Sequence, residues 1–240
     1  MVTKEANDSG PSDKGVILTL AGIRRGGRRL FPIALFTVPF GIAFGVAAIE
    51  SGLSSFQAIL MSLVTFSGAA QFATLDFWTE PLAFGSLAMV VLALNARQTI
   101  MGATLAPWIN RLPLSRRALV LGYPSDPNFA DSQPSFQNGE RDIGILLGGG
   151  LVLWACWVAG TAIGAFGGAE LGDPATFGVD VVMPCFFAAA IAGQFRQVEM
   201  IAPILAASAV SVALGVLLPG WNIVLAALVG GTVGTLYHSK

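Results

Sequence analysis

Charge is what this sequence has least of. Of its 240 residues, 11% are Asp, Glu, Lys or Arg and 54% are hydrophobic, whereas a soluble domain usually carries about 25% charged residues. The composition therefore excludes an ordinary soluble domain. The net charge is −1, and no run of basic residues is interleaved with aromatic ones. We therefore expect no nucleic-acid partner.

Residues that carry catalysis are also scarce. The sequence has one histidine, His238, and two cysteines, Cys156 and Cys185, that lie in apolar runs. A serine or metal-dependent hydrolase needs a histidine or an equivalent base beside its nucleophile, so the Ser67-Gly68 pair is not expected to form one. No Gly-x-x-x-x-Gly-Lys phosphate loop is present. We predict that the protein is not an enzyme and holds no metal or cofactor.

Long apolar runs are abundant. No charged residue occurs in 30–49, 51–75, 143–169 or 200–237, and about 20 apolar residues are enough to cross a bilayer as a helix. We predict an all-α polytopic membrane protein with about six to seven membrane segments, some of them broken or re-entrant helices. Its expected location is the inner (cytoplasmic) membrane.

Arginines set the expected orientation, because basic residues favour the cytoplasmic side of a membrane. One group precedes the first apolar run and another lies in the 110–142 segment, which its prolines mark as an irregular cytoplasmic loop. We predict a disordered cytoplasmic tail over 1–27, a single transmembrane transport domain over 28–238, and a cytoplasmic location for both termini. The arginines are Arg24, Arg25, Arg28 and Arg29, then Arg111, Arg116, Arg117 and Arg141.

The count of crossings leaves two topologies open for the first half. The second half makes four crossings and ends inside, so the first half must cross an even number of times. Either 54–75 is a re-entrant or broken hairpin hinged near Gly68, or the 81–109 segment splits into two half-helices near Gly102. A weak likeness between 36–49 and 180–193, which would run in opposite directions, is consistent with an inverted repeat, a common feature of transporters.

Arg97 lies near the middle of the apolar 81–109 segment. An arginine at membrane depth is costly and is usually kept for a partner, a watery cavity or a function. Either Arg97 binds an anionic group of a substrate, or it pins a break in the helix. Asn95 and Gln98 beside it are suited to hydrogen-bonding a polar ligand or a neighbouring helix.

A second polar group, formed by Ser67, Gly68 and Gln71, interrupts the apolar 51–75 run. A helix broken at Gly68 would expose backbone N–H groups that attract a carboxylate. Asp180 is the only acidic residue between Asp173 and Glu199, within an otherwise apolar stretch. It reads as an interfacial residue or, alternatively, as a site that couples transport to protons.

Five blocks, in order, resemble the AzlC-type family, the large subunits of branched-chain amino acid exporters. The likeness runs over most of the chain, and the order and spacing of the blocks carry it. The blocks are PFGIAFGVAAIESGLSS (39–55), FSGAAQF (66–72), LNARQTIMGATLAP (94–107), LGDPATFGVDVVMPCFFAAAI (171–191) and LPGWNIVLAALVGGTVGTL (218–236).

The resemblance implies secondary export of branched-chain or similar small neutral amino acids, coupled to the proton motive force, with a small AzlD-type membrane partner. For such a substrate, the polar residues within the apolar runs form the predicted binding site, and Asn95 and Arg97 among them match the family pattern. The predicted site consists of Arg97, Asn95, Gln98, Gln71, Ser67 and Gly68. The family typically has Asn-Leu-Arg-His where this chain has Asn95-Ala96-Arg97-Gln98, and Gln98 cannot carry a proton.

The resemblance also marks Asp126 as a gating residue or as the partner of an arginine. Asp180 is the other candidate for coupling or gating. The composition leaves two alternatives to the amino acid exporter. One is a transporter or channel for another small metabolite or ion, and the other is a membrane subunit that does not transport.

Overall fold

Helices make up the fold of the computed structural model, which describes residues 15–78, 82, 84–168, 198–217 and 221–238. Within these residues the only strand-like pairing is one isolated bridge, between Ile17 and Asp142. The helices are α1 (Leu20–Glu50), α2 (Ser55–Val64), α3 (Gly68–Leu75), α4 (Phe84–Ile109), α5 (Leu114–Leu121), α6 (Asp126–Gln137), α7 (Gly144–Gly167), α9 (Val198–Gly215) and α10 (Trp221–His238).

Four of these helices, α1, α4, α7 and α9, are long and apolar enough to cross a membrane. Helix α2 and residues 221–236 of α10 are shorter apolar helices. Large hydrophobic side chains such as Phe36, Leu92 and Val212 are exposed, which suits surfaces that face lipid. The prediction of an all-α polytopic membrane protein is therefore confirmed.

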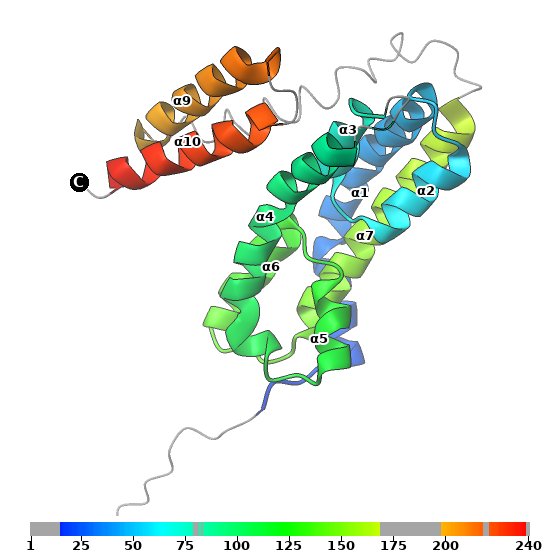
Figure 1. Ribbon diagram of the computed structural model, residues 1–240. Coiled ribbons are helices and arrows are strands. Elements are labelled where there is room, and N and C mark those ends of the chain that lie inside the picture. The colour runs from blue at the N-terminus through cyan, green and yellow to red at the C-terminus, as the bar shows by residue number, and fades with distance from the viewer. Residues whose placement is uncertain (1–14, 79–81, 83, 169–197, 218–220, 239–240) are drawn as a thin grey trace, which may run out of the picture.

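Helices α1 and α7 lie side by side and form the most extensive contact between two helices in the described residues (Figure 1). Glycines line the contact, and a Cβ atom built at Gly26 or Gly148 would overlap the main chain of the opposite helix. Small residues allow this close approach between membrane helices, where van der Waals packing replaces the hydrophobic effect.

We predict that Gly148→Ala destabilises the protein by about 1–3 kcal/mol, because the added methyl group forces apart two closely packed backbones. The measurement is thermal unfolding of the purified protein in detergent. Gly85→Ala in α4 is the matched control, since a Cβ there meets no atom within 4 Å. Equal melting temperatures for the two variants would contradict this description of the contact.

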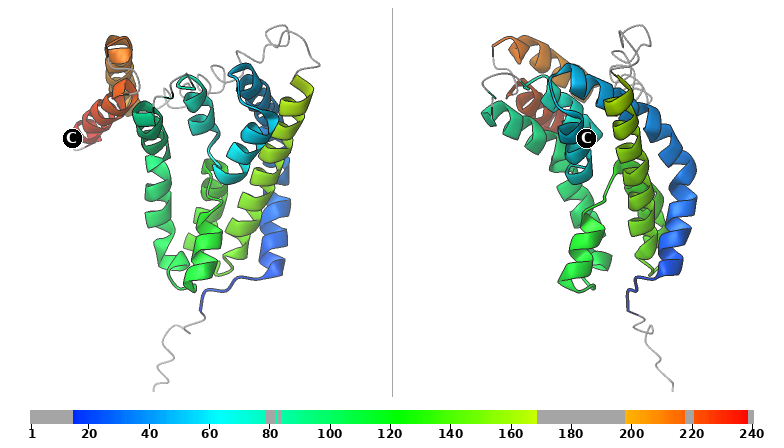
Figure 2. Two further views of the ribbon diagram at one scale, coloured as in Figure 1. Left: turned by 45° about the vertical axis from the view of Figure 1, so that its right-hand side comes forward. Right: turned by 90° about the vertical axis from the view of Figure 1, so that its right-hand side faces the viewer.

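Helices α2 and α3 form a broken hairpin that enters from the end of the molecule where α1 finishes (Figure 2). A capping box between Ser54 and Gln57 starts α2. The Ser55 hydroxyl donates to the Ala165 carbonyl near the end of α7, whereas Trp154, halfway along α7, donates to the Leu63 carbonyl. The chain therefore turns back at 65–67, halfway along α7, and α3 returns.

Helices α5 and α6 form a second hairpin at the opposite end. Arg29 of α1 pairs with Asp131 of α6 at 2.7 Å near the start of α1, while Asp126, at the first turn of α6, reaches the middle of α4. The tip of this hairpin, residues 122–125, therefore also lies about halfway along the long helices.

The two hairpins occupy corresponding places in the chain. Helix α1 ends at Glu50 and α4 at Ile109, 59 residues later. Helices α2 and α5 begin at 55 and 114, also 59 residues apart. Helices α3 and α6 begin at 68 and 126, 58 residues apart. A long helix followed by a half-length hairpin thus occurs twice, in opposite directions.

This arrangement decides between the two topologies. Helix α4 is continuous through Gly102, so the split of 81–109 is wrong, and the alternative with a broken hairpin near Gly68 is the one observed. The 110–142 segment is not an irregular loop, because it contains α5 and α6. Two of its prolines stand at helix starts, since Pro113 is the N-cap of α5 and Pro127 lies in the first turn of α6, whereas Pro134 lies inside α6.

The structure corrects one further prediction and leaves another untested. Helix α1 begins at Leu20, inside the 1–27 range predicted as a disordered tail, because the Thr19 hydroxyl caps the helix by accepting a hydrogen bond from the Gly22 amide. The internal likeness of 36–49 to 180–193 is not tested, since 180–193 lies outside the described residues. The opposed units that the structure does show are 20–75 and 84–137.

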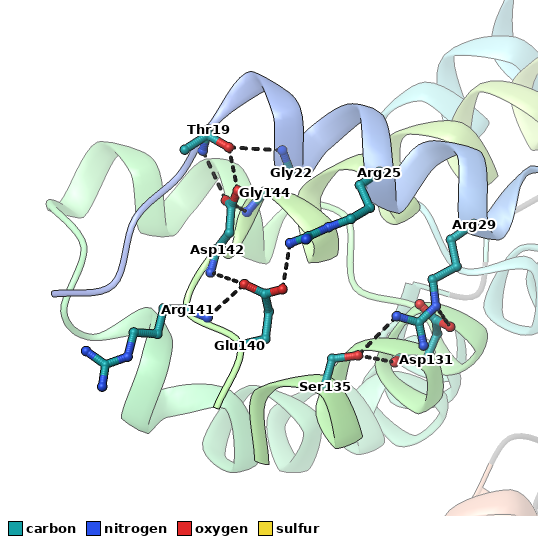
Figure 3. Close-up of polar contacts among 10 residues, drawn as sticks. All are labelled: Thr19, Gly22, Arg25, Arg29, Asp131, Ser135, Glu140, Arg141, Asp142 and Gly144. Carbon is teal, nitrogen blue, oxygen red and sulfur yellow. Dashed lines mark hydrogen bonds and ion pairs between the residues drawn. The ribbon is translucent and has the colours of Figure 1, made fainter. Parts of the chain in front are cut away.

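Polar contacts tie the arginine-rich end of α1 to the segment between α6 and α7 (Figure 3). Asp142 accepts hydrogen bonds from the Thr19 amide and hydroxyl and from the Gly144 amide. One carboxylate thereby satisfies donors at the N-termini of both α1 and α7, a favourable place for negative charge. Arg25 pairs with Glu140 at 2.6 Å on the same side.

Candidate functional site

A cavity of about 160 Å³ lies where the tips of the two hairpins meet the middle of α4. Its lining comes from α1, α4, α7 and both hairpins, so distant parts of the sequence build it together. The lining residues are Thr37, Phe66, Ser67, Gly68, Ala69, Arg97, Gln98, Met101, Pro124, Ser125, Asp126, Pro127, Leu153 and Trp157.

An ion pair forms one wall of this cavity. The Arg97 guanidinium lies 2.6 Å from the Asp126 carboxylate, so the charge near the midpoint of α4 has a partner on α6. The side chains are 48% and 55% exposed. Both groups are therefore open to a ligand in the cavity, unlike an ion pair sealed inside the protein.

Two helices begin at the cavity, and the hydroxyl groups of both their N-cap residues lack partners. Ser67 caps α3 and Ser125 caps α6, yet neither side chain accepts a capping hydrogen bond. Both Oγ atoms are buried without a partner, and Ser67 as a residue is only 6% exposed. A buried polar group without a partner is costly, so these hydroxyls are candidates to bind a polar ligand.

The two helix starts differ in charge. Helix α6 has Asp126 in its first turn, where a carboxylate is favourable next to free N–H groups. Helix α3 has no acid in its first turn, and Gly68 stands at the position that corresponds to Asp126. The α3 N-terminus therefore has space, N–H donors and the Ser67 hydroxyl, but lacks an anion of its own.

The remaining wall is apolar. Trp157 and Leu153 from α7, Met101 from α4 and Phe66 from the first hairpin tip contribute it. The Trp157 ring lies directly against Gly68: a Cβ built there would be 2.7 Å from Cη2 of the indole. The cavity thus combines one charged side with one hydrophobic side.

A buried hydrogen-bonded network holds the Trp157 ring in place from behind. The indole N–H donates to Oε1 of Gln71 at 2.9 Å, and Nε2 of Gln71 donates to the Ser62 hydroxyl at 2.8 Å. Ser62 in turn pairs with Thr161. Gln71 is fully buried, and both ends of its amide are occupied within the protein.

The structure brings together most of the residues predicted from the sequence. Arg97, Gln98, Ser67, Gly68 and Asp126 line the same cavity. Asn95 lines an adjacent cavity of about 180 Å³ between the hairpin tips. Its Nδ2 donates to the Val91 carbonyl, and its Oδ1 is buried without a partner.

Gln71 lies behind the cavity wall and is not part of the lining, and Asp180 lies outside the described residues. The sequence did not single out Ser125, Thr37 or Trp157 as lining residues. Ser125 had a signal, since Ser125-Asp126-Pro127 is a good helix start that parallels Ser67-Gly68. Among the described residues, no group of three or more His, Cys, Asp or Glu side chains is placed to hold a metal.

Comparison with known proteins identifies one protein family. The AzlC protein family model matches residues 32–171. The inner membrane protein YgaZ of Escherichia coli is 30% identical over 176 residues, which cover 69% of this chain and 70% of that protein.

Two uncharacterized membrane proteins are also similar. One, from Archaeoglobus fulgidus, is 32% identical over 151 residues, with 63% of this chain and 65% of that protein covered. The other, from Helicobacter pylori, is 25% identical over 166 residues, with 65% and 68% covered. No solved structure matches the chain.

Proposed function

The chain belongs to the AzlC family, and we propose from this premise that it is a secondary transporter that exports branched-chain or similar small neutral amino acids. The observation that carries the proposal is the cavity between the hairpin tips, which joins the Arg97–Asp126 ion pair to an apolar wall. This function needs no catalytic group, in keeping with the expectation that the protein is not an enzyme.

The substrate carboxylate binds between the N-terminus of α3 and Arg97. Free N–H groups at a helix start and a guanidinium both attract a carboxylate, and the unpartnered Ser67 hydroxyl gains a hydrogen bond there. Gln98 lines the same cavity, and its amide hydrogen-bonds the polar head of the substrate in this proposal. Asn95 and Gln71 support the site from the second cavity and from the buried network.

The branched side chain of the substrate lies against Trp157, Leu153 and Met101. A protein cavity of roughly 150 Å³ holds a molecule the size of benzene, so the cavity of about 160 Å³ suits a small amino acid. The proton motive force remains the proposed energy source, with Asp180 as a candidate for coupling. A small AzlD-type membrane protein remains the proposed partner.

The start of α1 and the 110–142 segment, which carry most of the arginines, lie at one end of the fold, because α1 begins where α5, α6 and the start of α7 gather (Figure 2). We propose that this side is cytoplasmic, because basic residues favour that side.

Counterflow of valine and leucine in proteoliposomes tests the function. The purified chain, with and without the small partner protein, should take up labelled amino acid faster when unlabelled amino acid is inside. Counterflow that requires a different solute, such as another small metabolite or an ion, would favour the alternative transporter. Absence of counterflow with every solute in both preparations would favour a subunit that does not transport.

A further inference from the structure

Asp126 faces the same ligand space as Arg97, and this placement has a consequence for specificity. The two charged groups are 2.6 Å apart and each is about half exposed, while α3 offers a helix start without an acid. We propose that Asp126 binds the ammonium group of the substrate and so restricts the site to zwitterions. This inference rests on the proposed transport of amino acids.

The charges near the cavity support this role. Without a ligand, one cation (Arg97) and one anion (Asp126) balance each other. A ligand carboxylate at the α3 N-terminus adds a second anion next to Arg97, and two anions then share one guanidinium. An ammonium group on the same ligand restores the balance, because it lies beside Asp126 while the carboxylate lies beside Arg97 and Ser67.

The geometry of the helix starts gives the ligand its orientation. Asp126 belongs to the first turn of α6 and Ser67 caps α3, and the two lie on the same cavity. The two N-termini therefore offer separate places: one already holds a carboxylate of the protein, and the other is free for a carboxylate of the ligand. An α-amino acid carries its two charged groups on one carbon, which suits two adjacent places.

Ligands with only one charge are excluded for opposite reasons. An acid without an amine leaves Asp126 and the ligand carboxylate in competition for Arg97. An amine without a carboxylate leaves the α3 N-terminus and the Ser67 hydroxyl without a partner. A site built around polar groups rejects an analogue that leaves them unpaired far more strongly than one that merely lacks a methyl group.

Valine and two analogues with the same branched side chain test the proposal: isovalerate (valine without its amine) and isobutylamine (valine without its carboxylate). Binding to the full chain in nanodiscs is measured by calorimetry. We expect the wild type to prefer valine over both analogues by about 100-fold or more. Wild-type protein that binds isovalerate as tightly as valine would overturn the inference without any variant.

Asp126→Asn is the informative variant. We expect it to bind valine about 10-fold more weakly and isovalerate more tightly than the wild type does, so that their affinities become similar. Asp126→Glu should keep the preference for valine. Asp76→Asn, an exposed acid at the C-terminal end of α3, is the matched control and should behave as the wild type.

The outcomes distinguish a failure of the proposed function from a failure of the proposed role of Asp126. Failure of the wild type to bind valine at all would contradict the proposed function. Normal valine binding together with an unchanged preference in Asp126→Asn would leave the function standing and overturn the role of Asp126.

Discussion

Arg97→Gln is expected to lower valine counterflow by about 100-fold or more, with normal insertion into the membrane. The variant removes the cation that faces the cavity and leaves Asp126 without its 2.6 Å partner. Each hydrogen bond between a guanidinium and a charged group contributes about 1.5–3 kcal/mol, and each 1.4 kcal/mol corresponds to about a tenfold change in binding. Counterflow in proteoliposomes with matched protein content is the measurement.

Arg111→Gln is the control for this prediction. Arg111 lies just beyond Asn110 after the end of α4, is exposed, and does not line the cavity that contains Arg97. Its substitution changes the net charge by the same amount and should leave counterflow near the wild-type rate. Equal losses in the two variants would show a general effect of charge, and normal transport by Arg97→Gln would remove Arg97 from the substrate site.

Gly68→Ala is expected to reduce counterflow by about 10-fold. The new Cβ would lie 2.7 Å from the Trp157 ring, and relief of such overpacking costs about 1–3 kcal/mol or displaces the ring into the substrate space. The same change at Gly85, where a Cβ meets no atom within 4 Å, should be neutral. Transport rates at matched expression give the comparison.

A second substitution identifies the cause. Trp157→Phe removes the part of the indole that the Gly68 Cβ would touch, and it also removes the hydrogen bond to Gln71. We expect Gly68→Ala to do no further harm once Trp157→Phe is present. Losses that simply multiply in the double variant would mean that the two residues act independently, contrary to the contact in the structure.

The sequence was most informative where a polar residue interrupts an apolar run. Arg97, Ser67 and Gly68 stood out for this reason, because the cost of polar groups at membrane depth leaves few explanations for their presence. All three line the cavity. The same reasoning misplaced Gln71, since a buried amide that is satisfied by Ser62 and Trp157 has the same sequence signature as one that faces a ligand.

The second hairpin was harder to predict. Its prolines and arginines resemble a cytoplasmic loop, and only tertiary packing shows that Asn128 is fully buried and donates to the Leu146 carbonyl of α7. The correspondence of α2–α3 with α5–α6 was also invisible, because it depends on where helices begin and end and not on similar residues. Pairing between Arg97 and Asp126 follows from that packing.

The substrate is proposed to occupy the cavity at the hairpin tips. Thr37 lines it, and its hydroxyl is already bonded to the Ala34 carbonyl, so Thr37→Cys places a thiol there at little cost. In protein with Cys156 and Cys185 replaced by Ser, valine should slow alkylation of this thiol severalfold. A thiol at the exposed Ser115 of α5 should react at an unchanged rate.

Isobutylamine and isovalerate should protect the Thr37→Cys thiol far less than valine does. Alkylation of that thiol at the same rate with and without saturating valine, in protein that carries out valine counterflow, would contradict the location of the site.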